Sequence, residues 1–486
     1  MINLTKNDKI RKNNLKRCKE KGIVIPTLDQ MKNPDKIPAE IKEKLKSVGL
    51  WELNPANLFR ISWKNEPKEK GGLFGNVNYV EFPSELTGVK ARIIGISGRW
   101  FPTGAHKVGA TFGCLVPPLV TGNFDSTTQK AVWPSTGNFC RGGAFNSALL
   151  GCESIAILPE EMSKERFEWL KSLAGEVIAT PGCESNVKEI FDKCWELRRT
   201  RNDIMIFNQF EELGNYVWHY EVTANAVADV FEQMKARNNK LSMQGYISST
   251  GSAGTIAAGD FLKKKYASCK IAASEALQCP TLLMNGYGGH RIEGIGDKHI
   301  PWIHNVRNLD MVIDIDDQDC IDVMRLFNED EGKKYLQSNG LSEKYIATLK
   351  SAGISGIANM LSAIKMAKHF EMNENNVIFT ILTDSMDLYG SRLTEENEKH
   401  GAFTHDDAVK SFHKSIMGAH TADMAELDYN AKKRIHNLKY FTWIEQQGKE
   451  LSELNAQWYD EEYWSRTAAL APEIDRLITE FNKDLN

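Results

Sequence analysis

From Val77 onward the chain alternates short apolar runs with amphipathic stretches, and this alternation restricts the possible folds more than any other feature. Runs with the composition of buried strands occur at residues 91–96, 130–133, 154–159, 176–180, 244–250 and 377–383. Strands that alternate with helices along a chain build parallel sheets whose two faces are covered by helices. We therefore expect an α/β fold for this part of the chain.

The two ends of the chain lack this alternation. Residues 1–75 are polar and rich in Lys, Asn and Glu, with one helix expected around Pro38 to Val48, and residues 396–486 are polar helical sequence with scattered aromatic side chains. We predict an N-terminal arm over 1–75, a core over 76–395 and a helical C-terminal extension over 396–486. Both ends are expected to pack on the core or on a second subunit, and a surface for another partner is the alternative for the C-terminal aromatic residues.

The overall composition is that of an ordinary globular protein and argues against several kinds of partner. The 486 residues are 42% apolar and 26% charged, enough for two compact units, and 60 basic against 64 acidic residues give a net charge of −4. This balance produces no general attraction to nucleic acid or to an anionic membrane. The sequence contains no apolar run long enough to span a bilayer, and Met1–Lys21 lacks the apolar centre of a signal peptide. We expect neither a nucleic acid nor a membrane as a partner.

Nine cysteines are scattered through the chain, and no two are spaced as Cys-x-x-Cys. An odd number without paired spacing indicates reduced thiols rather than a disulfide framework or a structural zinc site. We therefore expect a cytoplasmic protein without a metal site.

One lysine stands in an unusual setting. Lys107 follows the turn-forming Pro102-Thr103-Gly104 and precedes a run rich in Ala and Gly. A lysine on such a small-residue backbone can be buried, lose its proton and form a Schiff base. Most lysines are solvated surface charges, so the interpretation of Lys107 depends on the segments that follow.

A turn rich in small polar residues follows the expected strand at 130–133, which ends at Pro134. A strand that runs into such a turn and then into a helix, here expected over Phe145 to Leu150, leaves unpaired backbone N–H groups above the turn. These groups can hold a carboxylate, although a simple helix N-cap explains the turn equally well. The residues of the turn are Ser135, Thr136, Gly137 and Asn138.

A second turn of this kind follows the expected strand at 244–250 and leads into a helix that carries Asp260 to Lys265. Its small residues let the backbone approach an anion closely, and the helix N-terminus adds its dipole. The spacing is neither that of a Walker loop nor that of a dinucleotide site, so a single phosphate is the expected ligand and an unoccupied turn is the alternative. The turn consists of Gly251, Ser252, Ala253, Gly254 and Thr255.

Two later segments are also candidates for the same site. The glycine-rich stretch 286–296 is either a flexible surface loop or a loop that must pass close to a ligand. The strand expected at 377–383 ends at Thr383, followed by Asp384 and Ser385. Because ligands bind at the carboxyl ends of strands in open α/β sheets, these three residues are candidate contacts.

In this order along the chain, the segments resemble the pyridoxal-phosphate enzymes of fold type II, the superfamily of cysteine synthase, cystathionine β-synthase, threonine synthase and tryptophan synthase β. The stretch 102–107 is similar to the Schiff-base motif of that superfamily, and its Gly-Ala-His-Lys form is closest to tryptophan synthase β. The turn 135–138 resembles the substrate loop, and the turn 251–255 resembles the phosphate loop Gly-Thr-Gly-Gly-Thr. Three further matches are Asn208-Gln209-Phe210 with Asn215, His219-Tyr220 and Thr223, then His290–Gly296, and Gly353–Gly356.

The resemblance implies a fold of two open, twisted, mostly parallel sheets flanked by helices, with helical extensions at both ends. It divides the core 76–395 into two α/β subdomains with pyridoxal 5'-phosphate between them. It also implies a homodimer that acts on a small amino-acid substrate.

The resemblance assigns roles to individual residues. Lys107 holds the cofactor as a Schiff base and then acts as the base at the substrate Cα, while the turn 251–255 binds the cofactor phosphate. Asn138 lies near the ring hydroxyl, and the N–H groups of 135–138 hold the substrate carboxylate. Thr383 is the expected partner of the pyridine nitrogen, and Asp384 is the alternative.

The reaction implied is β-elimination or β-replacement on a serine or cysteine derivative through an aminoacrylate intermediate. Threonine-synthase-like γ-chemistry and dehydratase or ammonia-lyase chemistry are the enzymatic alternatives, and a non-catalytic cofactor-binding subunit is the alternative of another class. The sequence departs from cysteine synthases at Phe139-Cys140-Arg141, where those enzymes have small or hydroxyl residues. Arg141 is therefore a candidate for binding a bulky or anionic substrate side chain, or else a structural ion-pair partner.

Overall fold

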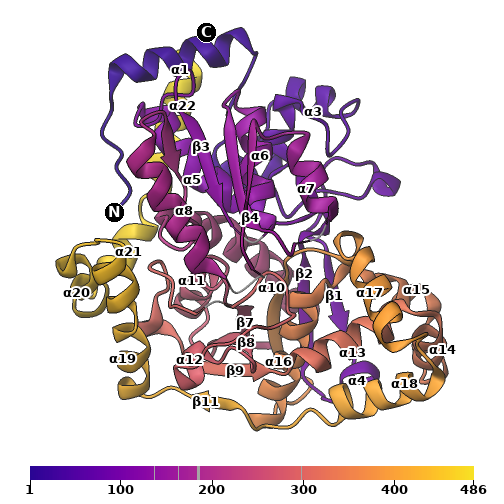
Figure 1. The fold of residues 1–486 in the computed structure, drawn as a ribbon. Helices are drawn as coiled ribbons and strands as arrows, with labels where there is room; N and C mark the ends of the chain where they lie inside the picture. The colour runs from indigo at the N-terminus through magenta and orange to yellow at the C-terminus, as the bar shows by residue number, and fades with distance from the viewer. Residues whose placement is uncertain (136, 163, 183–185, 297, 486) are drawn as a thin grey trace.

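The computed structural model describes residues 1–135, 137–162, 164–182, 186–296 and 298–485, except for the side chains of 164–166. It contains two sheets that belong to two lobes of the molecule (Figure 1). The larger sheet has seven strands in the spatial order β1 (Tyr79–Phe82), β2 (Arg92–Ser97), β10 (Asn376–Leu382), β7 (Ser242–Ser249), β8 (Lys270–Ala276), β9 (Met311–Ile315) and β11 (Met424–Glu426). The smaller sheet has the order β5 (Glu176–Thr180), β4 (Ser154–Pro159), β3 (Lys130–Pro134) and β6 (Ile204–Ile206).

Both sheets are mainly parallel. All three pairings in the smaller sheet are parallel, and only the edge strands β1 and β11 of the larger sheet run antiparallel to their neighbours. The expectation of two open, mostly parallel sheets is confirmed. Parallel strands must be joined by crossover connections, and helices supply them here.

Helices cover the faces of both sheets and pack their apolar sides against the strands. The largest is α16 (Ile354–His369), which packs on β10, β7 and β9 and is buried along nearly its whole length. In the smaller lobe α6 packs on β3 and β4, and α5 packs in turn on α6 and α9. The helices of the core are α4 (Ser84–Thr87), α5 (Lys107–Thr121), α6 (Asn138–Leu149), α7 (Lys164–Lys171), α8 (Val187–Thr200), α9 (Leu213–Trp218), α10 (Ala224–Arg237), α11 (Ala257–Lys265), α12 (Thr281–Met284), α13 (Asp317–Asn328), α14 (Asp330–Ser338), α15 (Glu343–Ile346), α16 and α17 (Gly390–His400).

The two ends of the chain pack on the core of the same molecule. Helices α1 and α22 lie together against α5 in the smaller lobe (Figure 1), and the Asn482 side chain bonds to the backbone of Ile25. The segment after residue 395 is not purely helical, because β11 adds an edge strand to the larger sheet beside β9. The helices of the two ends are α1 (Asp8–Glu20), α2 (Leu28–Lys32), α3 (Ala39–Leu45), α18 (His405–Lys410), α19 (Tyr429–Asn437), α20 (Leu451–Tyr459), α21 (Tyr463–Ala468) and α22 (Ala471–Lys483).

The six strands expected from the sequence are confirmed as β2, β3, β4, β5, β7 and β10. Strands β8 and β9 were not expected because each carries a buried carboxyl, Glu275 and Asp314, within its apolar run. Helix α6 begins at Asn138, earlier than the expected Phe145. Gly142 and Gly143 weaken the helical pattern there, yet both are needed because α6 lies so close to Val108 and Trp133 that a Cβ would come within 2.8 Å and 2.0 Å of those residues.

No helix in the described part of the chain is both long enough and apolar enough to cross a membrane.

Candidate active site

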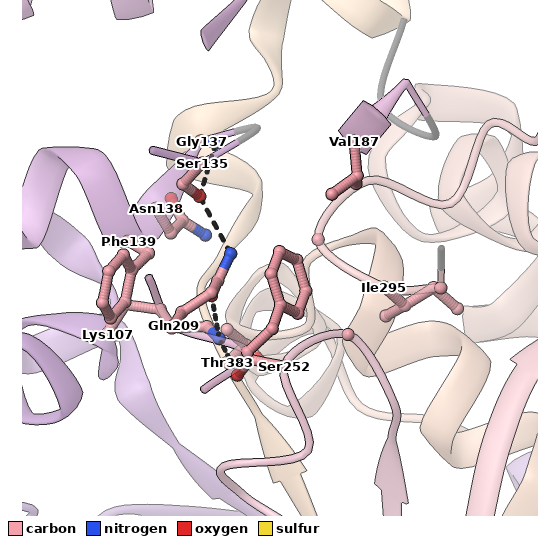
Figure 2. A pocket seen from close by; sticks show the side chains of 14 residues that line it. Lys107, Ser135, Gly137, Asn138, Phe139, Val187, Gln209, Ser252, Ile295 and Thr383 are labelled. Carbon is pink, nitrogen blue, oxygen red and sulfur yellow. Dashed lines mark hydrogen bonds between the residues drawn. The ribbon is translucent and has the colours of Figure 1, made fainter. Parts of the chain in front are cut away.

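A cavity opens where the carboxyl ends of strands from both sheets meet, and Lys107 lies in its wall (Figure 2). Ser135 follows β3 of the smaller sheet, whereas Gly251 and Thr383 follow β7 and β10 of the larger one. This is the edge at which open α/β sheets bind ligands. The lining residues are Lys107, Ser135, Gly137, Asn138, Phe139, Val187, Gln209, Phe210, Gly251, Ser252, Gly294, Ile295, Gly296 and Thr383.

Lys107 is the first residue of α5, and the tight turn Pro102–Gly104 delivers it to the cavity. Within that turn Thr103 has a φ of 68° and Gly104 a φ of 70°, both in the left-handed region. The Lys107 amine donates to Oε1 of Gln209 at 3.0 Å and to Oγ of Ser252 at 2.9 Å. The structure therefore joins the predicted catalytic lysine to the predicted phosphate loop.

Gln209 connects the two halves of the site, although no individual role was predicted for it from the sequence. Its Nε2 donates to Oγ of Ser135 at 3.1 Å, while its Oε1 accepts from Lys107 (Figure 2). Asn215 on α9 supports both ends of this arrangement by donating to the Gln209 carbonyl and to Ser252 Oγ. The signal that could have found Gln209 was its place in the Asn-Gln-Phe match.

The expected substrate loop also lines the cavity, at the N-terminus of α6. The N–H of Gly137 donates to Ser135 Oγ at 3.2 Å, and the amide nitrogen of Asn138 donates to Oδ2 of Asp384 at 2.6 Å. The Asn138 Oδ1 is buried and has no hydrogen-bond partner among the described residues. The expected contact at Thr136 lies outside the described residues.

The expected phosphate loop is only partly at the surface of the cavity. Gly251 and Ser252 line it, whereas Ala253, Gly254 and Thr255 continue the turn behind them. Position 254 must be a glycine, because a Cβ there would lie 2.1 Å from Oδ1 of Asn215. The Thr255 hydroxyl bonds to Ser248 at the end of β7.

The three candidate residues after β10 differ in whether they line the cavity. Thr383 lines the cavity, whereas Asp384 is buried beside it and its Oδ2 accepts from Asn138 and from the Tyr389 hydroxyl, each at 2.6 Å. Ser385 faces away and donates to Asp387. Thr383 is thus the residue of the three that faces the cavity.

Arg141 does not line the cavity. It lies on α6 one turn after Asn138, and its guanidinium carbon lies 4.8 Å from the ring centroid of Trp169 and 5.5 Å from that of Trp51. Cation–π contacts of this kind stabilise a buried arginine. The arrangement favours a structural role over the expected contact with a substrate side chain.

The glycine-rich stretch 286–296 does approach the cavity, through Gly294, Ile295 and Gly296. The reading of this stretch as a loop that passes close to a ligand is therefore supported. Gly251 and Gly294 belong to neighbouring turns, and a Cβ on Gly251 would lie 3.0 Å from the Gly294 carbonyl. No group of three or more His, Cys, Asp or Glu side chains in the described ranges could hold a metal ion.

The residues present fit pyridoxal phosphate. A lysine amine that can form a Schiff base lies in the wall, and a small-residue turn that can approach a phosphate lies beside it. The unpaired Oδ1 of Asn138 and the hydroxyl residue Thr383 supply polar groups for the ring.

Comparison with known proteins agrees with this fit. The family model described as pyridoxal-phosphate dependent enzyme matches residues 101–334. Cysteine synthase B of Campylobacter jejuni is 31% identical over 269 residues, which are 55% of this chain and 79% of that protein. Cystathionine beta-synthase of Saccharomyces cerevisiae is 23% identical over 389 residues, covering 78% of this chain and 73% of that protein.

Solved structures show the same fold. A cysteine synthase from Entamoeba histolytica superposes with a TM-score of 0.57 at 22% identity, over 70% of this chain and 93% of its own. A hydrogen sulfide-producing enzyme from Fusobacterium nucleatum gives 0.54 at 23% identity, over 72% and 92%. The resemblance drawn from the sequence is confirmed.

Proposed function

The chain belongs to the family of pyridoxal-phosphate-dependent enzymes, and we propose that the cavity beside Lys107 is where it catalyses β-elimination or β-replacement. The substrate is a β-substituted L-amino acid, namely a derivative of serine or cysteine. The observation that carries this assignment is the Lys107 amine, held at the meeting point of the two sheets by Gln209 and Ser252. The similarity to a cysteine synthase and a cystathionine beta-synthase supports the reaction class.

We propose a place for the cofactor among these residues. When bound, pyridoxal phosphate supplies an electron sink that stabilises negative charge at the substrate Cα. We assign its covalent attachment to Lys107, its phosphate to the turn 251–255 and its ring hydroxyl to Asn138. The unpaired Asn138 Oδ1 and the exposure of Gly251 and Ser252 to the cavity support these assignments.

Thr383 is assigned to the pyridine nitrogen because it faces the cavity. A neutral hydroxyl cannot hold a proton on that nitrogen as a carboxylate would, and this favours loss of a β-substituent over transamination. The Asp384 carboxylate is directed instead to Asn138 and Tyr389. The neighbouring carboxylate thereby serves to orient Asn138.

The substrate carboxylate is assigned to the N-terminus of α6. This helix has 12 residues, and the turn before it brings its first N–H groups to the cavity wall. Helix N-termini bind anions through these unpaired N–H groups and the helix dipole. An amino acid held there lies in the same cavity as the Lys107 amine.

Lys107 is the base that takes the proton from Cα. A neutral lysine amine has two N–H donors, and both have an acceptor here, Gln209 Oε1 and Ser252 Oγ. With both donors engaged, the amine is held in the wall of the cavity where the substrate binds. Gln209 is in turn fixed by its bond to Ser135, so the base and the substrate loop are positioned together.

We further propose a cytoplasmic homodimer whose core over 76–395 carries the activity. The nine cysteines, scattered and without any Cys-x-x-Cys spacing, support a reducing compartment. Light scattering of the purified protein tests the dimer, and a monomeric mass would overturn it.

The test of the function is a visible spectrum of the purified protein after addition of each of a panel of serine and cysteine derivatives, with assays for keto acid, ammonia and sulfide. Release of keto acid from one amino acid alone establishes elimination. Product formation only after a second nucleophile is added establishes replacement. A protein that takes up no cofactor would overturn the proposal, and turnover of γ-substituted substrates alone would replace it.

A further inference from the structure

Residues of the N-terminal arm, outside the stretch 101–334 that matches the family model, pack directly behind the lysine turn. Trp63 is only 2% exposed. Its ring centroid lies 4.9 Å from that of Phe101 and 5.7 Å from that of His106, the residue before Lys107. The arm therefore touches the segment that places the catalytic amine.

Trp63 also makes one hydrogen bond at this position. Its Nε1 donates to Oγ1 of Thr223 at 3.0 Å, and the same oxygen lies 2.8 Å from Nδ1 of His219. His219 and Thr223 are the first and last residues of a π-helical turn between α9 and α10. Such turns are rare and are found frequently at functional sites.

The hydrogen bond from Trp63 restricts the directions open to the Thr223 proton. The Trp63 N–H is a donor only, so it occupies one lone pair of Oγ1. Among the described residues, the only other hydrogen-bond partner of the hydroxyl is His219 Nδ1. Donation from the hydroxyl to Nδ1 gives the Thr223 proton a partner, and it places the proton of a neutral His219 on Nε2, a buried atom with no hydrogen-bond partner among the described residues.

His219 lies against His106, with the ring centroids 4.9 Å apart and the planes at 83°. Both rings are buried, and burial lowers the pKa of each well below its usual value. The charge of Lys107 lowers the pKa of both rings further. Both rings are thus neutral at pH 7, and the His219 ring contacts the residue that directly precedes Lys107.

We propose that Trp63 is a positioning residue of the active site. Its N–H fixes the Thr223 hydroxyl and so the tautomer of His219, while its ring holds His106 in place. The first turn of α5 then keeps Lys107 against Gln209 and Ser252. The N-terminal arm is then part of the catalytic unit. The kinetic test of this inference rests on the proposed function.

The kinetic test is a double-mutant cycle in the cofactor-loaded protein. Trp63→Phe removes the N–H and keeps an aromatic ring, and Thr223→Val removes the hydroxyl at nearly constant shape. Each is expected to lower kcat by about tenfold with little change in KM, as loss of one buried hydrogen bond and a small displacement of the base would do. The double variant is expected to be no worse than either single variant.

The matched control is Trp458→Phe, which removes the bond from another buried indole, to the Tyr429 hydroxyl at 3.3 Å, in the C-terminal extension. It is expected to leave kcat unchanged. Thr223→Ser, which keeps the hydroxyl, is expected to restore most of the activity lost in Thr223→Val.

The second readout does not need turnover. Nitrogen-15 labelling of the histidines and long-range proton–nitrogen spectra report which ring nitrogen is protonated, and loss of a signal in His219→Gln assigns it. Wild-type protein is expected to show His219 protonated on Nε2, and Trp63→Phe is expected to show a mixture of tautomers. An Nδ1-protonated His219 in the wild type, or a Trp63→Phe spectrum and kcat equal to those of the control, would overturn the inference. A changed tautomer in a protein that turns over no amino acid would support the inference and contradict the proposed function.

Discussion

The Lys107 amine lies 2.9 Å from the Ser252 hydroxyl, although 145 positions separate the two residues in the chain. Lys107 begins a helix that packs on the smaller-sheet lobe, and Ser252 lies in the turn after β7 of the larger sheet. The proposed catalytic base is therefore oriented only when the two lobes are docked. A change that weakens this docking should affect the chemistry before it affects the fold of either sheet.

The most direct prediction concerns Lys107 itself. Lys107→Ala is expected to abolish covalent attachment of the cofactor and to lower kcat by at least about 10³-fold, because nucleophile and base are lost together. Borohydride reduction followed by peptide mass analysis measures the attachment. Lys130→Ala, which removes a lysine that pairs with Glu153 at the start of β3, is the control and should retain it. Attachment at another lysine would disprove the assignment.

Substitution of Gln209 is expected to lower the rate of the reaction more than the stability of the fold. Gln209→Leu removes both the acceptor for Lys107 and the donor to Ser135, and a hydrogen bond to a group that changes charge contributes about 1.5–3 kcal/mol. We expect kcat/KM to fall by about 10- to 100-fold. Steady-state kinetics on the substrate found in the amino-acid panel will measure this. Gln244→Leu, at a glutamine on β7 that bonds to Ser242, should have no such effect.

Thr383 and Asp384 are expected to differ in what their substitution changes. Thr383→Val should shift the visible absorption of the bound cofactor, because the hydroxyl assigned to the pyridine nitrogen is removed. Tyr389→Phe removes one partner of Asp384 and should lower activity by no more than about tenfold, without a spectral shift. Absorption spectra of the two loaded variants are the measurement. A shift in Asp384→Asn but not in Thr383→Val would reverse the assignment.

Arg141 is expected to act on stability. Arg141→Met removes the cation–π contacts with Trp51 and Trp169, and we expect the free energy of unfolding to fall by about 1–2 kcal/mol. Urea unfolding measures the loss, and the KM for substrates with neutral and anionic β-substituents should stay within about twofold of the wild type. A rise in KM confined to the anionic substrate, with unchanged stability, would establish the substrate contact that the sequence suggested.

The sequence was sufficient to predict the architecture and most of the site because both rest on local signals. Apolar runs at strand length predicted β2, β3, β4, β5, β7 and β10, and the small-residue turns that follow β3 and β7 line part of the cavity. The strands that escaped prediction carry polar residues inside the core, such as Glu275 on β8, or are only three residues long, such as β6. Such strands are defined by their neighbours in the sheet and not by their own composition.

The features that were not predicted depend on contacts between segments far apart in the chain. Gln209 bonds to Lys107 across 102 positions, and Trp63 bonds to Thr223 across 160. Arg141 follows the substrate loop directly in sequence, yet the helix turns its side chain toward two indoles instead of the cavity. The position of a residue in the sequence does not by itself show which distant residues its side chain contacts.

The last prediction concerns stability and pH, through two buried carboxyls in the larger sheet. Glu275 and Asp314 are directly paired across β8 and β9. Burial raises the pKa of both, and the neighbouring Glu275 raises that of Asp314 further. The Glu275 carboxylate accepts from the N–H groups of Leu282 and Leu283, which favours its charged form, so Asp314 is the residue that stays protonated to higher pH.

A carboxyl with a raised pKa in the folded state keeps its proton there after the unfolded chain has lost it. The folded protein then binds more protons, so the free energy of unfolding falls as pH rises from the ordinary carboxyl range, near about 4, through neutral pH until the folded pKa is passed. Asp314→Asn removes one such proton and should reduce this slope by up to about 1.4 kcal/mol per pH unit. Urea unfolding at a series of pH values measures the slope. Asp330→Asn, which removes an exposed carboxyl on α14, should leave it unchanged, and parallel profiles for Asp314→Asn and the wild type would show that Asp314 is ionised in the fold.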